Sequence, residues 1–563
     1  MGVDPSIRSR GRATHDVHIS GGVIYDGFGG EPYMGDVVVD ADRIGYVGPP
    51  VVLEARRTID ARGLAVSPGF INMLSQSQES LLIDGRAMSE LVQGVTLQVT
   101  GEGDSMGPLT DSMAIRNQDR QANIRYPIHW RSLGGYLDFV ERRGISVNIA
   151  SMVGAATIRD YVLGESNIEP TGEQLAQMRT LVRQAMAEGA LGVSSALIYA
   201  PGAYATTGEL IALATEAARC GGIYITHLRS EGDNLLGALD EAIEISRLSG
   251  APAEIYHFKV AGRTNWPKLT DAISKIEEAR RQGLRITADM YPYTAGATGF
   301  DASMPHWVLD GGLEAWIARM KEPATRARLL REMRAPPAGF ESALVASGPE
   351  GARLMAFKND ALKPLIGKTL AEVARSRGLS PEETVVDLVI EDGTRVGVAY
   401  TVMSEDNVRR QIGLPWMSFC SDERATSPGG VFLEFAQHPR AYGSFARILG
   451  RYVRDEGAAT PADAIRRLTS LPADNLCLEG RGRLEAGAYA DIVIFDPETI
   501  QDHATFDHAQ RFATGVRHVL VNGAVALDDG SVTDVRAGRA IRGRCWANGG
   551  VARESGRDWD WRW

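Results

Sequence analysis

The stretch GELIALATEAARCGGIYITHL, residues 208–228, decides the fold class of this chain. It begins as a helical segment and ends in a short apolar run that is typical of a buried strand. The same order of helix and strand returns in residues 237–259 and in residues 268–291. Upstream, Thr171 and Gln174 form a T-x-x-Q capping box that opens a further helical run. Repeated helix–strand units of this length predict a parallel sheet.

The number of such units gives the architecture of the middle of the chain. About eight units fit into residues 67–475, which favours an α/β fold with a closed (β/α)8, TIM-like barrel and insertions. An open, doubly wound sheet is the alternative. No glycine-rich phosphate-binding fingerprint follows the early strands, so the barrel is the better interpretation.

The two ends of the chain have a different pattern from the middle. Residues 14–66 and 478–545 contain short β-rich pieces joined by Gly and Pro turns. We expect them to form one small β-sandwich domain beside a barrel of residues 67–477. Residues 300–345 are helical and charge-rich, and we interpret them as an insertion that acts either as a lid or as a plain decoration. Residues 546–563 form a C-terminal tail that docks on a neighbouring subunit or is disordered.

Composition excludes several classes of protein. The net charge of -11 gives no general attraction to nucleic acid or to an anionic membrane. The N-terminus has no apolar signal-peptide region, and no stretch approaches the length of a membrane helix. The 4 cysteines are far apart in the sequence, which predicts no structural disulfide and a reducing compartment. We therefore expect a soluble cytoplasmic protein, with a homo-oligomer as a possible assembly and a small molecule as its partner.

Three side chains at strand ends are candidates for chemistry. His227 ends the strand of residues 223–227, His257 ends the next strand, and Asp422 ends the stretch WMSFCSD. Active sites of (β/α)8 barrels lie at the carboxyl ends of the strands, and neutral imidazoles with carboxylates are ligands that zinc prefers. Glu423 competes with Asp422 for the role of the strand-end carboxylate, and Asp422 also suits the N-cap of a following helix.

An ordered set of motifs covers nearly the whole chain. It consists of SPGFI, QGVT, GALGVSSALIYAPG, THLRSEGD, HFKVAG, ADMYPYTAG, CSDERA, HPRAYGSFARILGRYVR and GRLEAGAYADIVIFDP. With these motifs the chain resembles the N-acyl-D-amino-acid deacylase (D-aminoacylase) branch of the amidohydrolase superfamily. The resemblance implies a metal-dependent (β/α)8 barrel beside a small β-sandwich made from both chain ends.

The resemblance also implies a metal site with a departure from the family pattern. The His-x-His of the family's first strand falls on Leu74 and Gln76, so the weaker of two metal positions is expected to be lost. The histidines of the tighter position match His227 and His257, and the place of its cysteine falls on Glu102. We expect one zinc held by Glu102, His227 and His257, with Asp104 as the alternative carboxylate. Manganese, cobalt or iron also suit such ligands.

The same resemblance assigns the reaction. Asp422 would take a proton from a metal-activated water and pass it to the leaving amine. Lys259, Tyr291 and Arg440 match residues that hold the carboxylate of the substrate. The expected activity is hydrolysis of an amide in N-acyl (D-)amino acids. Another amide (a cyclic imide, a dipeptide or a xenobiotic amide) is the alternative, and a non-catalytic amidohydrolase-like binding protein is a further one.

Overall fold

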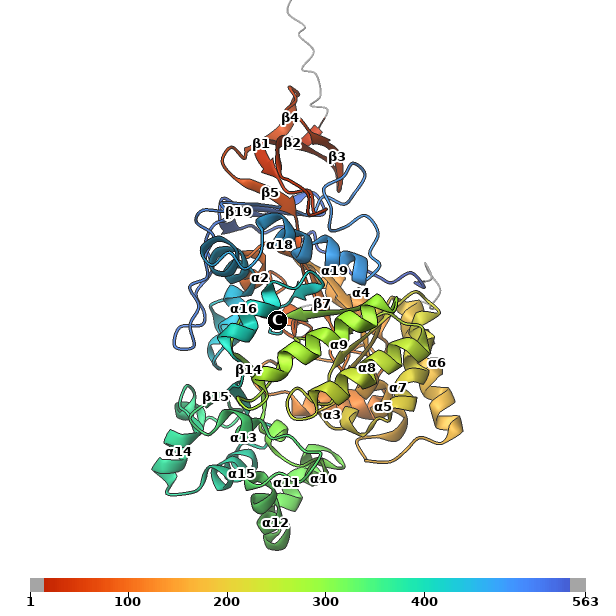
Figure 1. Ribbon diagram of the computed structural model, residues 1–563, viewed down its shortest axis with the longest axis vertical. Helices are drawn as coiled ribbons and strands as arrows, with labels where there is room; N and C mark the ends of the chain where they lie inside the picture. Colours follow the sequence, from red (N-terminus) through yellow and green to blue (C-terminus); the bar gives the residue numbers. More distant parts are fainter. Residues whose placement is uncertain (1–14, 547–563) are drawn as a thin grey trace, which may run out of the picture.

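The structure, a computed structural model, describes residues 15–546. The expectations for the extreme N-terminus and for the tail after Trp546 lie outside the described residues. The described part is elongated, with a β-rich domain at one end, helices α10–α15 at the other end, and the repeated helix–strand units between them (Figure 1). The chain is therefore a mixed α/β protein with a separate β domain.

The β domain is a 9-stranded sheet made from both ends of the chain, as the β-rich end segments predicted. Its strands run in the order β21-β20-β19-β18-β5-β1-β2-β3, and β4 pairs with β1. The two chain ends meet where β5 pairs with β18 in antiparallel register, with Val66 opposite Ile494. Apolar side chains of both ends, such as Ile19, Val37 and Ile492, are buried together. The strands are β1 (His15–Ile24), β2 (Tyr33–Asp40), β3 (Arg43–Gly48), β4 (Ala55–Asp60), β5 (Ala65–Pro68), β18 (Ile492–Phe495), β19 (Val516–Val521), β20 (Ala524–Asp528) and β21 (Ser531–Val532).

The central strands pair in parallel, as the helix–strand repeats predicted. One 3-stranded sheet has the order β6-β7-β8, and a 6-stranded sheet has the order β17-β13-β12-β11-β10-β9. Strands β8 and β9 are separated by Met152 alone, so the two sheets follow one another along the chain. The strands are β6 (Phe70–Asn72), β7 (Val95–Thr100), β8 (Asn148–Ser151), β9 (Val153–Gly154), β10 (Gly192–Ala196), β11 (Ile223–His227), β12 (Ala253–Ile255), β13 (Ile286–Met290) and β17 (Met417–Phe419).

Backbone hydrogen bonds join the first and last of these parallel strands. Just beyond β6 and β17, the N–H of Asp422 donates to the carbonyl of Leu74 at 2.9 Å, and the N–H of Gln76 donates to the carbonyl of Glu423 at 3.0 Å. The N–H of Met73 donates to the carbonyl of Phe419. The segment that carries Gln76 is thus fixed beside the segment that carries Asp422.

Helices cover the outside of the parallel strands (Figure 1). Helix α6 begins with the predicted capping box, in which Thr171 and Gln174 bond each other's backbone N–H groups. None of the helices in residues 15–546 is both long and apolar enough to span a bilayer. The helices of this part are α1 (Ser80–Ile83), α2 (Met88–Leu91), α3 (Asp111–Arg120), α4 (Leu133–Arg143), α5 (Ala155–Leu163), α6 (Gly172–Glu188), α7 (Thr207–Ala218), α8 (Leu235–Ser249), α9 (Leu269–Arg281), α16 (Glu405–Ile412), α17 (Arg440–Arg447), α18 (Pro461–Leu468) and α19 (Ser470–Asn475).

An insert follows β13 and returns to the central strands at β17. Its strands form a 3-stranded sheet in the order β14-β16-β15, and its helices pack beyond that sheet. The helical stretch within residues 300–345 is the middle of this larger unit. Its elements are β14 (Ala295–Gly299), α10 (His306–Leu309), α11 (Gly312–Lys321), α12 (Pro323–Arg334), α13 (Ala343–Ser347), β15 (Ala352–Ala356), α14 (Leu370–Arg377), α15 (Pro381–Asp392) and β16 (Gly397–Thr401).

One prediction about the cysteines was wrong. Cys220 and Cys545 form a disulfide across 325 residues of sequence, while Cys420 and Cys477 are free. The C-terminal segment brings them together, because it leaves the β domain and runs along β8, where the N–H of Ile541 donates to the carbonyl of Ile149 at 2.7 Å. The spacing of the cysteines in the sequence does not reveal this disulfide, because only the return of the C-terminal segment brings Cys220 and Cys545 together.

Candidate metal and active site

A large cavity opens at the carboxyl ends of the central parallel strands. Its volume is about 1390 Å³, and the insert supplies one of its walls. This is the end of the sheet where loops of parallel α/β folds gather catalytic groups. Every site residue proposed from the sequence lines this cavity: Glu102, His227, His257, Lys259, Tyr291, Asp422 and Arg440.

Glu102 is presented by a glycine turn directly after β7. Gly101 and Gly103 have φ angles of +96° and +67°, which side chains with a Cβ rarely adopt. A Cβ on Gly103 would lie 2.6 Å from the Cβ of Ala196, so the turn also needs glycine for space. The tight turn after the strand therefore aims the carboxylate between its two glycines into the cavity.

Glu102, His227 and His257 converge on one point. The Oε1 of Glu102 lies 3.2 Å from the Nδ1 of His227 and 2.9 Å from the Nε2 of His257. The two imidazole nitrogens are 2.9 Å apart. His257 has a φ of +34°, and its N–H donates to Asp289 at 2.8 Å, which fixes this strained residue at the strand end.

This group fits a metal by its chemistry and its spacing. The three residues offer one carboxylate oxygen and two imidazole nitrogens, the ligand types of a His2Glu zinc site. Zinc bonds of about 2.0–2.2 Å at a tetrahedral angle place two ligand atoms about 3.3 Å apart, and the separations observed here are slightly shorter. The opposite nitrogen of His227, Nε2, is buried without a hydrogen-bond partner among residues 15–546, so Nδ1 is the atom of that ring engaged in the group.

The two carboxylates beside the imidazoles are held ionised by their cationic neighbours. Burial acts to raise the pKa of Glu102, but the charge of His257 and the hydrogen bonds of both imidazoles outweigh it, and the pKa lies well below its usual range. The pKa of Glu231 is also lowered, because Lys259, His227 and His257 outweigh its burial. Both carboxylates therefore stay ionised in the protein interior, the state that a carboxylate metal ligand requires.

Glu231 is a site residue that the sequence reasoning missed. Its Oε1 lies 2.6 Å from the Nζ of Lys259 and 3.2 Å from the Nδ1 of His257, the nitrogen that faces away from the metal group. The Nζ of Lys259 lies closer to that nitrogen, at 2.6 Å, so Glu231 and Lys259 together hold the imidazole of His257 in place. The signal was its position in THLRSEGD, four residues after His227 in the same strand-end loop.

Asp422 lies beside the metal group and is held from two sides. It has a φ of +48°, and its Oδ2 lies 2.8 Å from the Nη1 of Arg440. Its Oδ1 accepts a hydrogen bond of 3.3 Å from the amide of Gln76. The competing Glu423 lies farther from Arg440, at 3.8 Å.

Lys259, Tyr291 and Arg440 also converge. The guanidinium carbon of Arg440 lies 4.5 Å from the centre of the Tyr291 ring, and the Nζ of Lys259 lies 5.7 Å from the same centre. All three side chains are buried. The Nη1 of Arg440 is engaged by the ion pair with Asp422, whereas its Nε makes no hydrogen bond to any residue of the described part of the chain and can face a ligand. Two buried cations around one aromatic ring suit an anionic group of a small molecule.

Asp104, the alternative metal ligand, stands apart from the group. It lines the cavity and is exposed to solvent there, and it does not belong to the ligand group of Glu102, His227 and His257. Desolvation by the surrounding protein and the charge of the neighbouring Asp160 raise the pKa of Asp104 to about 6. This geometry favours Glu102 over Asp104 as the carboxylate ligand.

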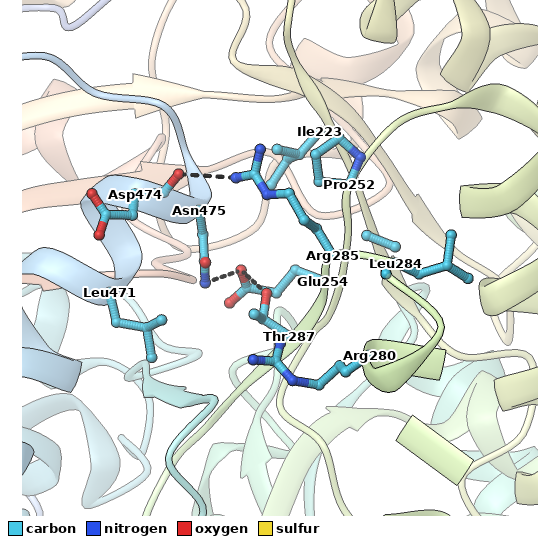
Figure 2. Close-up of a pocket in the computed structure, with 12 residues that line it drawn as sticks. Ile223, Pro252, Glu254, Arg280, Leu284, Arg285, Thr287, Leu471, Asp474 and Asn475 are labelled. Carbon is cyan, nitrogen blue, oxygen red and sulfur yellow. Dashed lines mark hydrogen bonds between the residues drawn. The ribbon is translucent and has the colours of Figure 1, made fainter. Parts of the chain in front are cut away.

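A second cavity, of about 360 Å³, lies at the opposite ends of the strands (Figure 2). Glu254 reaches into it from β12 and accepts hydrogen bonds from Thr287, Ser418 and Asn475. Burial and the nearby Asp289 raise the pKa of Glu254 to about 8. Because side chains of the protein already hydrogen-bond to both oxygens of this carboxyl group, we interpret Glu254 as a buried structural residue.

Comparisons with known proteins agree with this geometry. The sequence pattern described as "Amidohydrolase family" matches residues 57–527. The D-aminoacylase of Alcaligenes xylosoxydans xylosoxydans is 33% identical over 537 residues, which cover 93% of this chain and 97% of that protein.

Solved structures of similar proteins extend the likeness to three dimensions. The N-acyl-D-glutamate deacylase of Bordetella bronchiseptica, crystallised with zinc and a phosphonate inhibitor that mimics the tetrahedral intermediate, has a TM-score of 0.78 at 28% identity. The match covers 94% of this chain and 99% of that one. A D-aminoacylase structure, described by the functional role of its binuclear metal centre with one-metal activation and second-metal attenuation, has a TM-score of 0.76 at 32% identity. That match covers 94% of this chain and 100% of the other.

Proposed function

This chain belongs to the amidohydrolase family, and we propose that it is a zinc-dependent hydrolase that removes the acyl group from N-acyl D-amino acids. One observation carries the proposal. A zinc-type ligand group, an aspartate and two buried cations meet in one cavity at the strand ends. A hydrolase of acylated amino acids needs these parts together, since one end of its substrate is an amide and the other a carboxylate.

Glu102, His227 and His257 would hold the metal. Bound there, zinc would supply a Lewis acid that polarises the amide carbonyl and lowers the pKa of a water. Glu231 and Lys259 both contact the Nδ1 of His257, at 3.2 and 2.6 Å, and keep its imidazole oriented. The ion pair of Glu231 with Lys259 leaves that cation close to the ligand group.

Asp422 is the proposed general base and acid. It accepts the proton of the attacking water and returns it to the nitrogen of the leaving amino acid. Arg440 serves both ends of the substrate, because its Nη1 pairs with Asp422 and its Nε, which makes no hydrogen bond within residues 15–546, faces the α-carboxylate. Lys259 and Tyr291 complete the carboxylate site. A substrate held in this way presents its amide to Asp422 in a fixed orientation.

We further propose that the central strands form a closed (β/α)8 barrel and that the β domain is the small β-sandwich of the family. The bonds between the segments after β6 and β17 support closure. The cytoplasmic location stays a prediction, and the Cys220–Cys545 disulfide counts against a reducing compartment.

The insert is proposed to act as a lid over the cavity. Glu341 ties it to the strand-end loop that carries Glu231. The carboxylate of Glu341 accepts from the N–H groups of Gly232 at 3.1 Å and Asn234 at 2.8 Å, and from the hydroxyl of Ser230.

The test is hydrolysis by the zinc-loaded protein. N-acetyl derivatives of D-amino acids, their L enantiomers, a hydantoin and a dipeptide would be compared at equal concentration. We expect release of acetate from the D series with the highest kcat/KM. Turnover of the hydantoin or the dipeptide alone would replace the proposed substrate class, and turnover of none by fully loaded protein would contradict the enzyme function.

A further inference from the structure

One amide group links the proposed metal ligand to the proposed base. The Nε2 of Gln76 lies 2.7 Å from the Oε2 of Glu102 and 3.3 Å from the Oδ1 of Asp422. The other oxygen of Glu102, Oε1, faces the two imidazoles. The two carboxylates are therefore joined through a neutral donor on the side away from the histidines.

The chemistry of the neighbours fixes the orientation of this amide. An NH2 group has two hydrogens and so can donate to both carboxylates at once, whereas the amide oxygen would be repelled by them. The backbone holds the side chain in this place, because the N–H of Gln76 donates to the carbonyl of Glu423 and the N–H of Ser75 donates to the carbonyl of Val99 at 2.7 Å. Leu74, two residues earlier, is fully buried among apolar side chains and offers no ligand atom.

We propose that Gln76 is a positioning residue that restricts this site to a single metal. Its NH2 group fills the gap between Glu102 and Asp422, the place where a second cation would find two carboxylate ligands. The hydrogens of the amide carry partial positive charge, so they satisfy the two carboxylates and repel a cation. The inference rests on the proposed function for the identity of the first metal site.

The consequence is a site that the Gln76 amide limits to one metal. A D-aminoacylase of similar structure is described by a binuclear centre whose second metal attenuates activity. In this chain hydrogen bonds from Gln76 hold the base and the ligand without a second metal. The same bonds keep Glu102 turned so that Oε1 stays with the imidazoles.

The first experiment counts metal. Purified protein would be stripped with a chelator, reloaded with excess zinc and desalted, and zinc per chain would be measured by plasma mass spectrometry. We expect one zinc in the wild type and in Gln78→Met, a control that lines the same cavity without a hydrogen bond to either carboxylate. We expect two in Gln76→His, with the second released first in a chelator titration.

Two outcomes would overturn the proposal. One is two zinc ions in the wild type. The other is a single zinc in a folded Gln76→His protein that keeps the first ion. If Gln76→His does not fold, zinc per chain is measured in the isosteric Gln76→Glu instead, because this variant also replaces the amide donor with a metal ligand. These counts do not depend on turnover, so they stand apart from the test of the deacylase activity.

A second variant tests the positioning role. Gln76→Met keeps the volume of the side chain and removes both hydrogen bonds. We expect it to retain one zinc, to bind that zinc about tenfold more weakly, and to lose about tenfold in kcat while KM stays within twofold. A merely structural role would leave the zinc affinity and kcat of the folded variant at wild-type values, and this result would overturn the inference.

Discussion

The guanidinium of Arg440 lies 2.8 Å from the carboxylate of Asp422, and both side chains are buried. Arg440 begins α17, whereas Asp422 follows β17, so a loop of the chain separates the two partners. The pair gives the proposed base a fixed direction, and the Nε of Arg440, which makes no hydrogen bond within residues 15–546, offers a second place for an anion. In the proposed mechanism this relationship couples recognition of the substrate to the position of the base.

Arg440→Lys should weaken recognition of the substrate carboxylate. Lysine keeps the charge but loses the planar fork of donors, and hydrogen bonds to charged groups are worth about 1.5–3 kcal/mol. We expect kcat/KM for an N-acyl D-amino acid to fall by about 10–100-fold. The control is the carboxamide of the same substrate, for which the variant and the wild type should differ little. An equal loss for both compounds would show that Arg440 acts through Asp422 alone.

Asp422→Asn should abolish proton transfer without emptying the metal site. Asparagine keeps the shape of the side chain but cannot accept the proton, and general acid–base catalysis contributes about 10²–10⁴-fold. We expect kcat to fall by that range at unchanged zinc content. Glu423→Gln is the matched control and should retain most of the activity, since Glu423 lies farther from Arg440. The assignment fails if the two variants exchange these phenotypes.

Much of this site was predictable because its residues follow the ends of strands. His227 ends β11 and His257 follows the end of β12 by two residues, and parallel pairing of the two strands brings such places together. Glu102 lies in a turn whose glycines mark it in the sequence. The β domain was predictable for a similar reason, since both chain ends have the pattern of short strands.

The remaining features depend on contacts that sequence patterns do not carry. Glu231 matters because its side chain reaches Lys259 and His257, and the sequence only shows that it is near them. The role of Gln76 needs the backbone hydrogen bonds between the segments that follow β6 and β17, which set it beside Asp422. The Cys220–Cys545 disulfide arises from the path of the C-terminal segment, which no local periodicity records.

Glu102→Ala and Asp104→Ala should separate the two candidate carboxylate ligands. Glu102 lies within 2.9 Å of the Nε2 of His257, whereas Asp104 lies outside the ligand group. Removing one of three protein ligands from a zinc site should leave little zinc after desalting. We expect the zinc content to fall from about one zinc per chain to near zero in Glu102→Ala, and to stay near one in Asp104→Ala. Loss of zinc in Asp104→Ala with retention in Glu102→Ala would reverse the assignment.

Glu341→Ala should loosen the insert where it meets the strand-end loop. The variant leaves the N–H groups of Gly232 and Asn234 without their carboxylate partner. We expect faster hydrogen exchange in residues 230–234 and in the insert, and a rise in KM of about 3–10-fold, the loss of about 1 kcal/mol. Glu350→Ala, which changes an exposed residue of the same insert, is the control. Unchanged exchange in residues 230–234 would show that Glu341 does not fasten the insert to this loop.

Glu254 should make the stability of the folded protein fall as the pH rises toward 8. Its pKa is raised to about 8 in the folded protein by burial and by Asp289, while in the unfolded chain the carboxyl group has its ordinary pKa of 4.5. Between these two values the folded state keeps a proton that the unfolded state releases, so raising the pH favours unfolding. The slope from one such group is at most about 1.4 kcal/mol per pH unit.

The measurement is the thermal midpoint of the wild type and of Glu254→Gln at several values between pH 5 and pH 8. Glutamine carries no titrating proton, so the wild type should lose stability relative to the variant as the pH rises. The difference should shrink or change sign toward pH 5, where Glu254 is protonated in the folded protein and the hydrogen bonds from Thr287 and Asn475 persist. Parallel curves across this range would mean that Glu254 is ionised in the folded protein, in contradiction to its raised pKa.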